Sequence, residues 1–227
     1  MACSWSILIF LWSIIKTTKL ATNKTIYLIR HGQTDYNRRG IVQGSGIDSD
    51  LNAYGRSQAQ AFFDRYGDIP FDHVYTSELK RTIQSVEQFL DKGLSHTALP
   101  ELNEINWGIH EGRESTESSR EEFLRVVDGW RAGNLDLAIQ GGETPNAMYN
   151  RQRMGWEKIM KDGFEQILIC MHGRAMRSFL SLIMRSPLRD MDQYPHGNLC
   201  LYKLEGNEES LEIVLANDVT HLDLIPS

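Results

Sequence analysis

Two histidines stand at the same point of two similar stretches. Arg30 and His31 follow the apolar run at residues 25–29, and His172 follows a second apolar run at residues 166–171. A guanidinium group can form hydrogen bonds to two phosphate oxygens at once, and a neutral imidazole can attack phosphorus to form a covalent phosphohistidine. These residue types therefore favour a site that binds and transfers phosphate.

The two apolar runs must place these side chains near each other. Each run has the length and composition of a buried strand, and each is followed by Gly and then by a polar loop or a helical pattern. Ligands of open α/β sheets lie beyond the carboxyl ends of the strands, so parallel neighbouring strands would bring His31 and His172 into one pocket. A helix starting at Gly173 would add its N-terminal amides, which also favour an anion.

The rest of the chain alternates strand and helix patterns, which is typical of an α/β fold with a mostly parallel sheet. Apolar spacing predicts helices over residues 53–66, 79–90 and 145–160 and one that starts after Ser118. Ser77 is the expected cap of the second helix, Ser118 with Glu121 forms the expected capping box of the fourth, and residues 99–112 are expected to be loop. Residues 199–204 and 211–216 indicate an antiparallel hairpin at the sheet edge.

Composition limits the classes of function. The chain has 227 residues, 41% of them hydrophobic, and a formal net charge of -6, which argues against general nucleic-acid binding. Its three cysteines are too few for a disulfide framework, so a reducing compartment, the cytoplasm, is the expectation. We expect one domain over residues 24–227 with a small cap around residues 105–141. No oligomeric state is predicted.

Residues 1–23 form an extension that precedes this domain. Residues 5–15 are apolar but too short to span a bilayer, so no stable membrane span is predicted. The run has no preceding Lys or Arg and no clear cleavage site. Three interpretations stay open: a poor export signal, a membrane-associating anchor, or a disordered extension that could be an over-called start. We favour the last, because the first strand pattern starts cleanly after Lys24. The first two would place the protein outside the cytoplasm or at a membrane.

Residues 30–37, Arg-His-Gly-Gln-Thr-Asp-Tyr-Asn, resemble the Arg-His-Gly-x-Thr-x-x-Asn signature of the histidine phosphatase superfamily, also called the phosphoglycerate mutase-like family. Five further motifs follow in the family's order, at residues 43–59, 77–82, 102–112, 141–151 and, as Met-His-Gly, 171–173. The resemblance covers roughly residues 25–220 and implies a three-layer α/β/α sandwich with a mostly parallel central sheet.

The resemblance also implies roles for individual residues. His31 would be the phosphorylated nucleophile and Glu104 the acid that protonates the leaving oxygen. The phosphate-binding residues would be Arg30, Arg81, His172 and Asn37. The substrate side would include Gln43, Gly44 and Gly173. No metal or other cofactor is implied, and the expected partner is a small phosphorylated substrate.

Several of these roles have competitors. Glu101 and Glu111 lie in the same segment as Glu104, and Asn37 and Gln43 could simply form turns. Three further arginines lie near site segments but are equally compatible with an exposed face: Arg113, Arg174 and Arg177. Cys170 and Trp107 are expected in the core or the site wall.

The catalytic residues of this family serve both hydrolysis and phosphoryl shuttling. Cofactor-dependent phosphoglycerate mutases carry a longer insertion after the loop that bears the acid, which here is residues 102–112. The corresponding segment of this chain, residues 112–141, is short and contains no proline. We therefore expect a metal-independent phosphatase acting on phosphomonoesters of small metabolites. A mutase is the alternative, and a phospho-ligand binding module without turnover is the second alternative.

Overall fold

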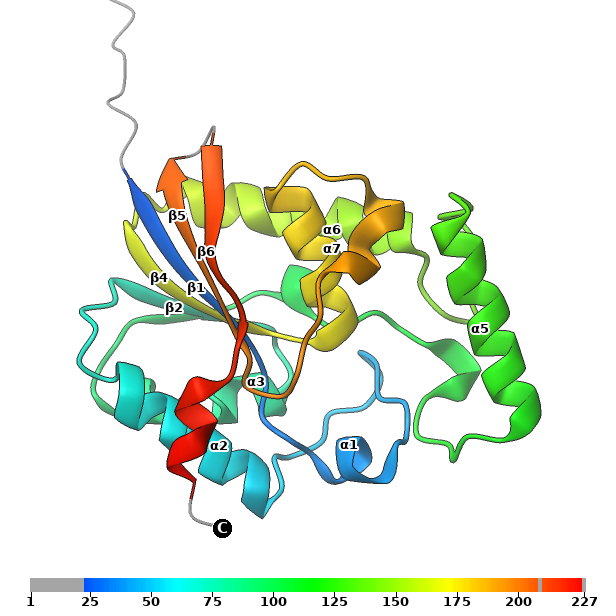
Figure 1. The fold of residues 1–227 in the computed structure, drawn as a ribbon, viewed down its shortest axis with the longest axis horizontal. Coiled ribbons are helices and arrows are strands. Elements are labelled where there is room, and N and C mark those ends of the chain that lie inside the picture. The colour runs from blue at the N-terminus through cyan, green and yellow to red at the C-terminus, as the bar shows by residue number, and fades with distance from the viewer. Residues whose placement is uncertain (1–22, 208–209, 226–227) are drawn as a thin grey trace, which may run out of the picture.

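The computed structural model describes residues 23–207 and 210–225, and they form helices packed on both faces of one sheet (Figure 1). The six strands follow the order β3-β2-β4-β1-β5-β6. Their bounds are β1 Lys24–Arg30, β2 His73–Thr76, β3 His96–Ala98, β4 Gln166–Met171, β5 Leu201–Asn207 and β6 Ser210–Asp218. The first four are mutually parallel, and β5 and β6 form an antiparallel edge hairpin. The predicted fold class is thus confirmed.

The helices cover the sheet and its loops. Their bounds are α1 Asp35–Arg39, α2 Ala53–Tyr66, α3 Lys80–Gln84, α4 Glu87–Asp91, α5 Glu117–Arg131, α6 Pro145–Lys161 and α7 Gly173–Ile183. Short 3₁₀ turns are η1 Pro100–Leu102, η2 Gly108–His110, η3 Leu188–Gln193 and η4 Thr220–Leu224. No helix in the described part of the chain is long and apolar enough to cross a membrane.

Strand β1 is buried on both faces because its side chains alternate between two cores. Ile26 and Leu28 join the core beneath α6 and α7, whereas Tyr27 and Ile29 join the core beneath α2 and α4. This double burial explains why the strand is a continuous apolar run rather than an alternating one. It also fixes the strand firmly, so its last residues are held at a defined position.

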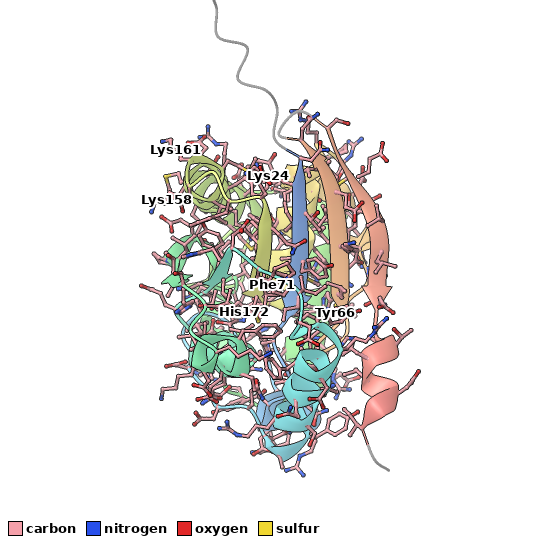
Figure 2. All side chains as sticks on the ribbon, turned by 90° about the vertical axis from the view of Figure 1, so that its left-hand side faces the viewer. Lys24, Tyr66, Phe71, Lys158, Lys161 and His172 are labelled. Carbon is pink, nitrogen blue, oxygen red and sulfur yellow. The ribbon has the colours of Figure 1, made fainter. Side chains whose placement is uncertain are left out.

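The register of the sheet brings the two histidine segments together. Arg30 pairs with Met171 across the parallel β1–β4 ladder, so His31 and His172 follow at the same edge. Figure 2 shows Lys24, at the start of β1, and His172 at opposite ends of the sheet. The predicted convergence of the two strand tips is confirmed.

The structure corrects three local predictions. The single helix expected over residues 79–90 is two short helices, α3 and α4, and Leu79 rather than Ser77 holds the N-cap position. The break follows Ser85, whose hydroxyl donates to the Arg81 carbonyl at 2.6 Å and accepts the Gly32 amide at 2.9 Å. A serine that bonds backbone in this way competes with continued helix.

The other two corrections concern residues 96–119. The three-residue strand β3 precedes the segment 99–112 that was expected to be loop, and η1 and η2 lie within that segment. Helix α5 starts earlier than predicted, because Thr116 and Ser119 form the capping box instead of Ser118 and Glu121. The N-terminal extension expected over residues 1–23 lies outside the described residues, apart from Asn23.

Candidate active site

His31 lies directly after β1 and is buried. Its Nδ1 is 2.7 Å from the Gly32 carbonyl oxygen. A carbonyl can only accept, so Nδ1 carries the hydrogen and Nε2 keeps its lone pair. Burial holds the pKa of His31 well below its ordinary value, and the charges of Arg81 and Arg30 lower it further. His31 is therefore a neutral imidazole with a free nucleophilic nitrogen.

His172 lies at the N-cap of α7, with its ring centroid 5.2 Å from that of His31. Its Nδ1 accepts the Arg81 Nε–H at 3.2 Å, and its Nε2 is 2.8 Å from the Ser77 hydroxyl. Because arginine can only donate, Nδ1 is the acceptor and Nε2 carries the hydrogen. Burial, followed by the charge of Arg81, holds the pKa of His172 well below its usual value. Ser77 and Arg81 together fix the ring.

Arg81 is completely buried, although arginine side chains are seldom fully buried without a charged partner. Its guanidinium group donates to the carbonyls of Ile47 at 2.6 Å and Gly44 at 3.2 Å, and it forms no ion pair among the described residues. Burial lowers the pKa of Arg81 to about 10, opposed by the negative charge of Glu104. A buried cation held only by neutral groups favours an anionic ligand.

Arg30 is the second such cation. One terminal nitrogen donates to the His196 Nδ1 at 3.2 Å, while its buried Nε has no partner. Burial lowers the pKa of Arg30, and the carboxylate of Glu104 opposes that change. The unpaired Nε is a donor that a phosphate oxygen would satisfy.

The three candidate acids lie in different surroundings. Glu101 forms an ion pair with Lys158 on α6. The Glu104 carboxylate accepts the backbone amides of Ile105, Arg174 and Ala175 at 2.8–3.0 Å, so it lies at the N-terminus of α7 beside His172. Burial lowers the pKa of both Arg30 and Arg81 and the negative charge of Glu104 raises it, so this carboxylate lies near both arginines.

Glu111 packs against the loop that contains Gly44. It accepts the Trp107 amide at 2.8 Å, and a Cβ on Gly44 would be only 2.0 Å from its Oε1. Burial raises the pKa of Glu111. Since the Gly44 carbonyl holds Arg81, Glu111 supports the loop that orients this arginine.

Asn37 and Gln43 each form a hydrogen bond with Thr34. The Asn37 Oδ1 accepts the Thr34 amide and the Asn198 Nδ2, both at 3.2 Å, which leaves its own Nδ2 without a described partner. Gln43 donates to the Thr34 hydroxyl at 2.7 Å and accepts the Ser49 hydroxyl at 2.7 Å. Gln43 thus shapes the loop, whereas the Asn37 amide keeps a donor available.

Gly173 allows a close approach that any side chain would block. A Cβ at this position would be 2.7 Å from the His196 Cε1. Burial and the charges of Arg30 and Arg177 lower the pKa of His196 to about 3, so it accepts from Arg30 as a neutral ring. Of the three uncertain arginines, Arg113 is exposed, but Arg174 and Arg177 are only partly accessible and both donate to Asp192.

Sequence reasoning missed Ser77, His196 and Asn198 as site residues. Ser77 follows β2, and the strand-end rule that identified His31 would have found it. His196 and Asn198 reach the site because β5 runs antiparallel to β1, with Leu201 opposite Ile29. The segment 195–198 resembles an ordinary turn, and only the strand order reveals its position.

Two neutral histidines and two arginines without carboxylate partners, Arg81 buried and Arg30 partly buried, lie together at the strand ends of an α/β/α sandwich, and such a group is suited to bind and transfer a phosphoryl group. The chain belongs to the histidine phosphatase superfamily (branch 1), whose family model matches residues 26–219. The family assignment made from the sequence motifs is confirmed.

Individual relatives carry several activities by name. The fructose-2,6-bisphosphatase TIGAR B of Danio rerio is 31% identical over 156 residues, which cover 66% of this chain and 57% of that protein. A probable phosphoglycerate mutase, GpmB of Erwinia tasmaniensis, is 29% identical over 87% of this chain and 94% of its own. The alpha-ribazole phosphatase structure from Shigella flexneri has a TM-score of 0.74 at 26% identity and covers 86% of this chain and 96% of that chain.

Proposed function

We propose that this chain hydrolyses phosphomonoesters of small metabolites through a phosphohistidine at Nε2 of His31. The observation that carries the proposal is the neutral His31, whose lone pair is on Nε2 and which lies near two arginines that form no ion pair among the described residues, the buried Arg81 and the partly buried Arg30. Relatives named as phosphatases of small metabolites, such as the fructose-2,6-bisphosphatase and the alpha-ribazole phosphatase, support the same class of reaction.

In the first step the lone pair of His31 Nε2 attacks phosphorus. The N–P bond forms as the ester P–O bond breaks, and the leaving oxygen takes a proton from Glu104, which enters this step as the protonated carboxylic acid and leaves it as the carboxylate. Arg30 and Arg81 would hold the phosphoryl oxygens, together with the Nδ2 of Asn37. His172, whose two ring nitrogens contact Arg81 and Ser77, would assist phosphate binding by orienting the Arg81 guanidinium. The positive charges stabilise the transferred group without requiring a metal ion.

In the second step water attacks the phosphohistidine. Glu104, now a carboxylate, takes a proton from that water, the N–P bond breaks, and its electron pair returns to Nε2. Inorganic phosphate leaves and the enzyme is restored. Gln43, Gly44 and Gly173 would border the organic part of the substrate, Gln43 through the loop that it stabilises.

A substrate panel tests this proposal. We expect the purified protein to release phosphate from at least one phosphomonoester between acid and neutral pH, in the presence of EDTA. His31→Ala should abolish this release and also the acid-labile phosphoenzyme. If wild-type protein forms no phosphoenzyme and His31→Ala behaves identically, the chain is a binding module instead.

The similarity to the probable mutase GpmB over nearly its full length supports a second candidate, a phosphoglycerate mutase. A mutase would interconvert 3- and 2-phosphoglycerate only after priming by a bisphosphorylated compound and would release little phosphate. The ratio of isomerisation to hydrolysis, measured on the same preparation, separates the two reactions.

We further propose a reducing compartment, the cytoplasm, as the place of action. Cys170 and Cys200 are buried free thiols, as is usual where disulfides do not form. Fractionation of cells expressing the full chain tests this placement.

A further inference from the structure

Asp192, on the 3₁₀ turn η3, accepts hydrogen bonds from three arginines of two helices. Its Oδ1 accepts from Arg174 at 2.5 Å and from Arg177 at 2.6 Å, both on α7, and its Oδ2 accepts from Arg131, at the end of α5, at 2.9 Å. In the described part of the chain, Arg174 and Arg177 pair with no other carboxylate. Burial alone would raise the pKa of Asp192, but the charges of Arg174 and Arg177 hold it below its usual value, so Asp192 is ionised.

Arg174 connects this cluster to the active site through its backbone. Its amide donates to the Oε2 of Glu104 at 3.0 Å, and the following amide, of Ala175, donates to the Oε1 at 2.8 Å. Both amides belong to the first turn of α7, where amides have no partner within the helix, and the N-cap residue His172 offers them no side-chain acceptor. The orientation of the Glu104 carboxyl group therefore depends on the position of this first turn.

The side chain of Arg174 is held against the protein rather than in solvent. It is 10% exposed, and its guanidinium carbon lies 5.4 Å from the ring centroid of Trp130 and 5.9 Å from that of Trp107. Asp192 supplies the negative charge that this site needs. Removing one partner of such an ion pair leaves an uncompensated charge, which the chain relieves by turning the guanidinium group toward water. The backbone of Arg174 would move with it.

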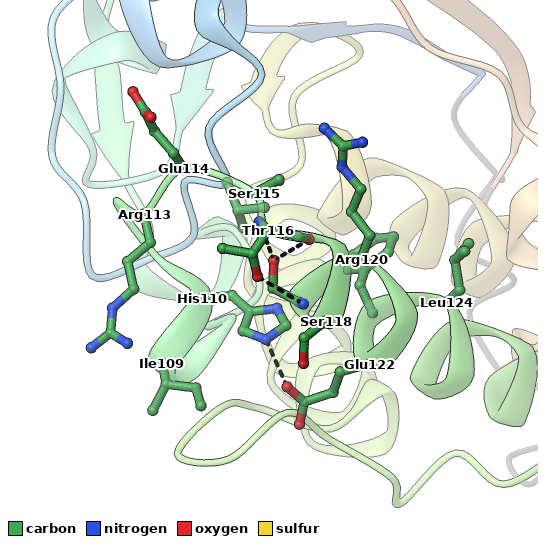
Figure 3. A pocket seen from close by; sticks show the side chains of 13 residues that line it. Ile109, His110, Arg113, Glu114, Ser115, Thr116, Ser118, Arg120, Glu122 and Leu124 are labelled. Atoms are coloured by element: carbon green, nitrogen blue, oxygen red, sulfur yellow. Dashed lines mark hydrogen bonds and ion pairs between the residues drawn. The ribbon is translucent and has the colours of Figure 1, made fainter.

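Helix α5 has other attachments that do not involve Asp192. Near its start the Glu122 carboxylate accepts the Nε2–H of His110 at 2.8 Å (Figure 3). The next residue, Phe123, packs against Trp107, with ring centroids 5.1 Å apart. Loss of the Asp192 carboxylate should therefore leave α5 in place and act at the first turn of α7.

We propose that Asp192 is a positioning residue for the catalytic acid. By holding the side chain of Arg174 it fixes the first turn of α7, whose amides orient the Glu104 carboxyl group for proton transfer. The inference rests on the proposed role of Glu104 as the acid in hydrolysis at His31. It has a specific kinetic consequence, because a misplaced acid slows only a reaction whose leaving oxygen needs a proton.

The test compares two esters that differ in their need for the acid. 4-Nitrophenolate leaves as a stable anion, whereas the alkoxide of glycerol 3-phosphate must be protonated as it leaves. In Asp192→Asn we expect kcat/KM to fall about tenfold or more for glycerol 3-phosphate and less than about twofold for 4-nitrophenyl phosphate. Asp190→Asn, which changes a carboxylate with 51% exposure on the same turn, is the matched control and should change neither value. Equal falls for the two esters in Asp192→Asn, or an unchanged ratio, overturn the proposal.

A double-mutant cycle tests the route through Arg174. Arg174→Gln removes the other end of the ion pair and keeps the backbone amide, so it should shift the ratio of the two kcat/KM values in the same direction. Adding Asp192→Asn to Arg174→Gln should shift the ratio no further. An unchanged ratio in Arg174→Gln overturns the proposal, as do effects that multiply in the double variant, because Asp192 would then act through another residue.

Failure of the proposed hydrolysis gives a different result, since the wild-type protein then cleaves neither ester. Residue-resolved amide hydrogen exchange on the intact protein decides the positioning in that case, and also if only one ester is cleaved. We expect the Arg174 and Ala175 amides to exchange about tenfold faster in Asp192→Asn than in the wild type and in Asp190→Asn. Equal exchange rates in the three proteins overturn the inference.

Discussion

Replacing Ser77 by Ala tests whether the second histidine is held by its hydrogen bonds. The Ser77 hydroxyl contacts the His172 Nε2 at 2.8 Å and accepts the Leu79 amide at 3.1 Å. The Ala variant leaves both donors buried without an acceptor, at about 1–3 kcal/mol each. We expect the free energy of unfolding to fall by about 2–6 kcal/mol, which lowers Tm by roughly 4–24 °C in a chain of this size.

The same change should weaken catalysis more than stability alone explains. Without the Ser77 hydroxyl, the His172 ring is no longer fixed, and neither is the Arg81 guanidinium, whose Nε–H donates to that ring. The value of kcat/KM should therefore fall about 10–100-fold, and the inhibition constant of orthovanadate should rise. Thermal melting and steady-state kinetics at a temperature well below both melting points measure the two effects separately.

Ser178→Ala is the matched control. Ser178 is as deeply buried as Ser77, but its hydroxyl has no hydrogen-bond partner, so its removal should cost little stability and no activity. If Ser77→Ala melts and binds vanadate like Ser178→Ala, the inferred positioning of His172 is refuted. If only Tm falls, Ser77 stabilises the fold without orienting the site.

Two further predictions follow from the same region. Gly44→Ala should lower kcat/KM about tenfold, because its Cβ would be 2.0 Å from the Glu111 side chain and 2.4 Å from the Ile105 carbonyl and would displace the loop that holds Arg81. The control is Gly197→Ala, whose Cβ would meet open space, and it should leave kcat/KM unchanged. The free energy of unfolding should fall as pH drops below about 6.5, because the pKa values of His31 and His172 are lowered in the folded chain, so the unfolded chain binds protons that the folded chain does not. The loss should be about 1.4 kcal/mol per pH unit for each histidine. Melting temperatures that stay constant between pH 7 and pH 5 would contradict the lowered pKa values.

The sequence predicted best the elements whose patterns are local. Strands β1 and β4 are apolar runs because both faces are buried, and each ends sharply at the residue that the site uses. The predicted residues His31, His172, Arg30, Arg81 and Glu104 accordingly lie together in the structure.

The failures depend on contacts between distant parts of the chain. The helix expected over residues 79–90 breaks because Ser85 bonds Gly32, 53 positions away. His196 and Asn198 enter the site through the antiparallel placement of β5, which no spacing of apolar residues encodes. Glu104, which the motif already favoured over Glu111, differs from it in the structure by accepting the Arg174 and Ala175 amides.

The strand order has a consequence for synthesis of the chain. Strand β1 is the first to emerge from the ribosome, but both of its partners, β4 and β5, are late, the nearer one starting at Gln166. At 5–20 residues per second, an apolar strand with two unpaired edges waits roughly 7–30 s for its neighbours. Nascent chains that stop before β4 carry this strand uncovered, so they are the form of the protein most dependent on chaperones.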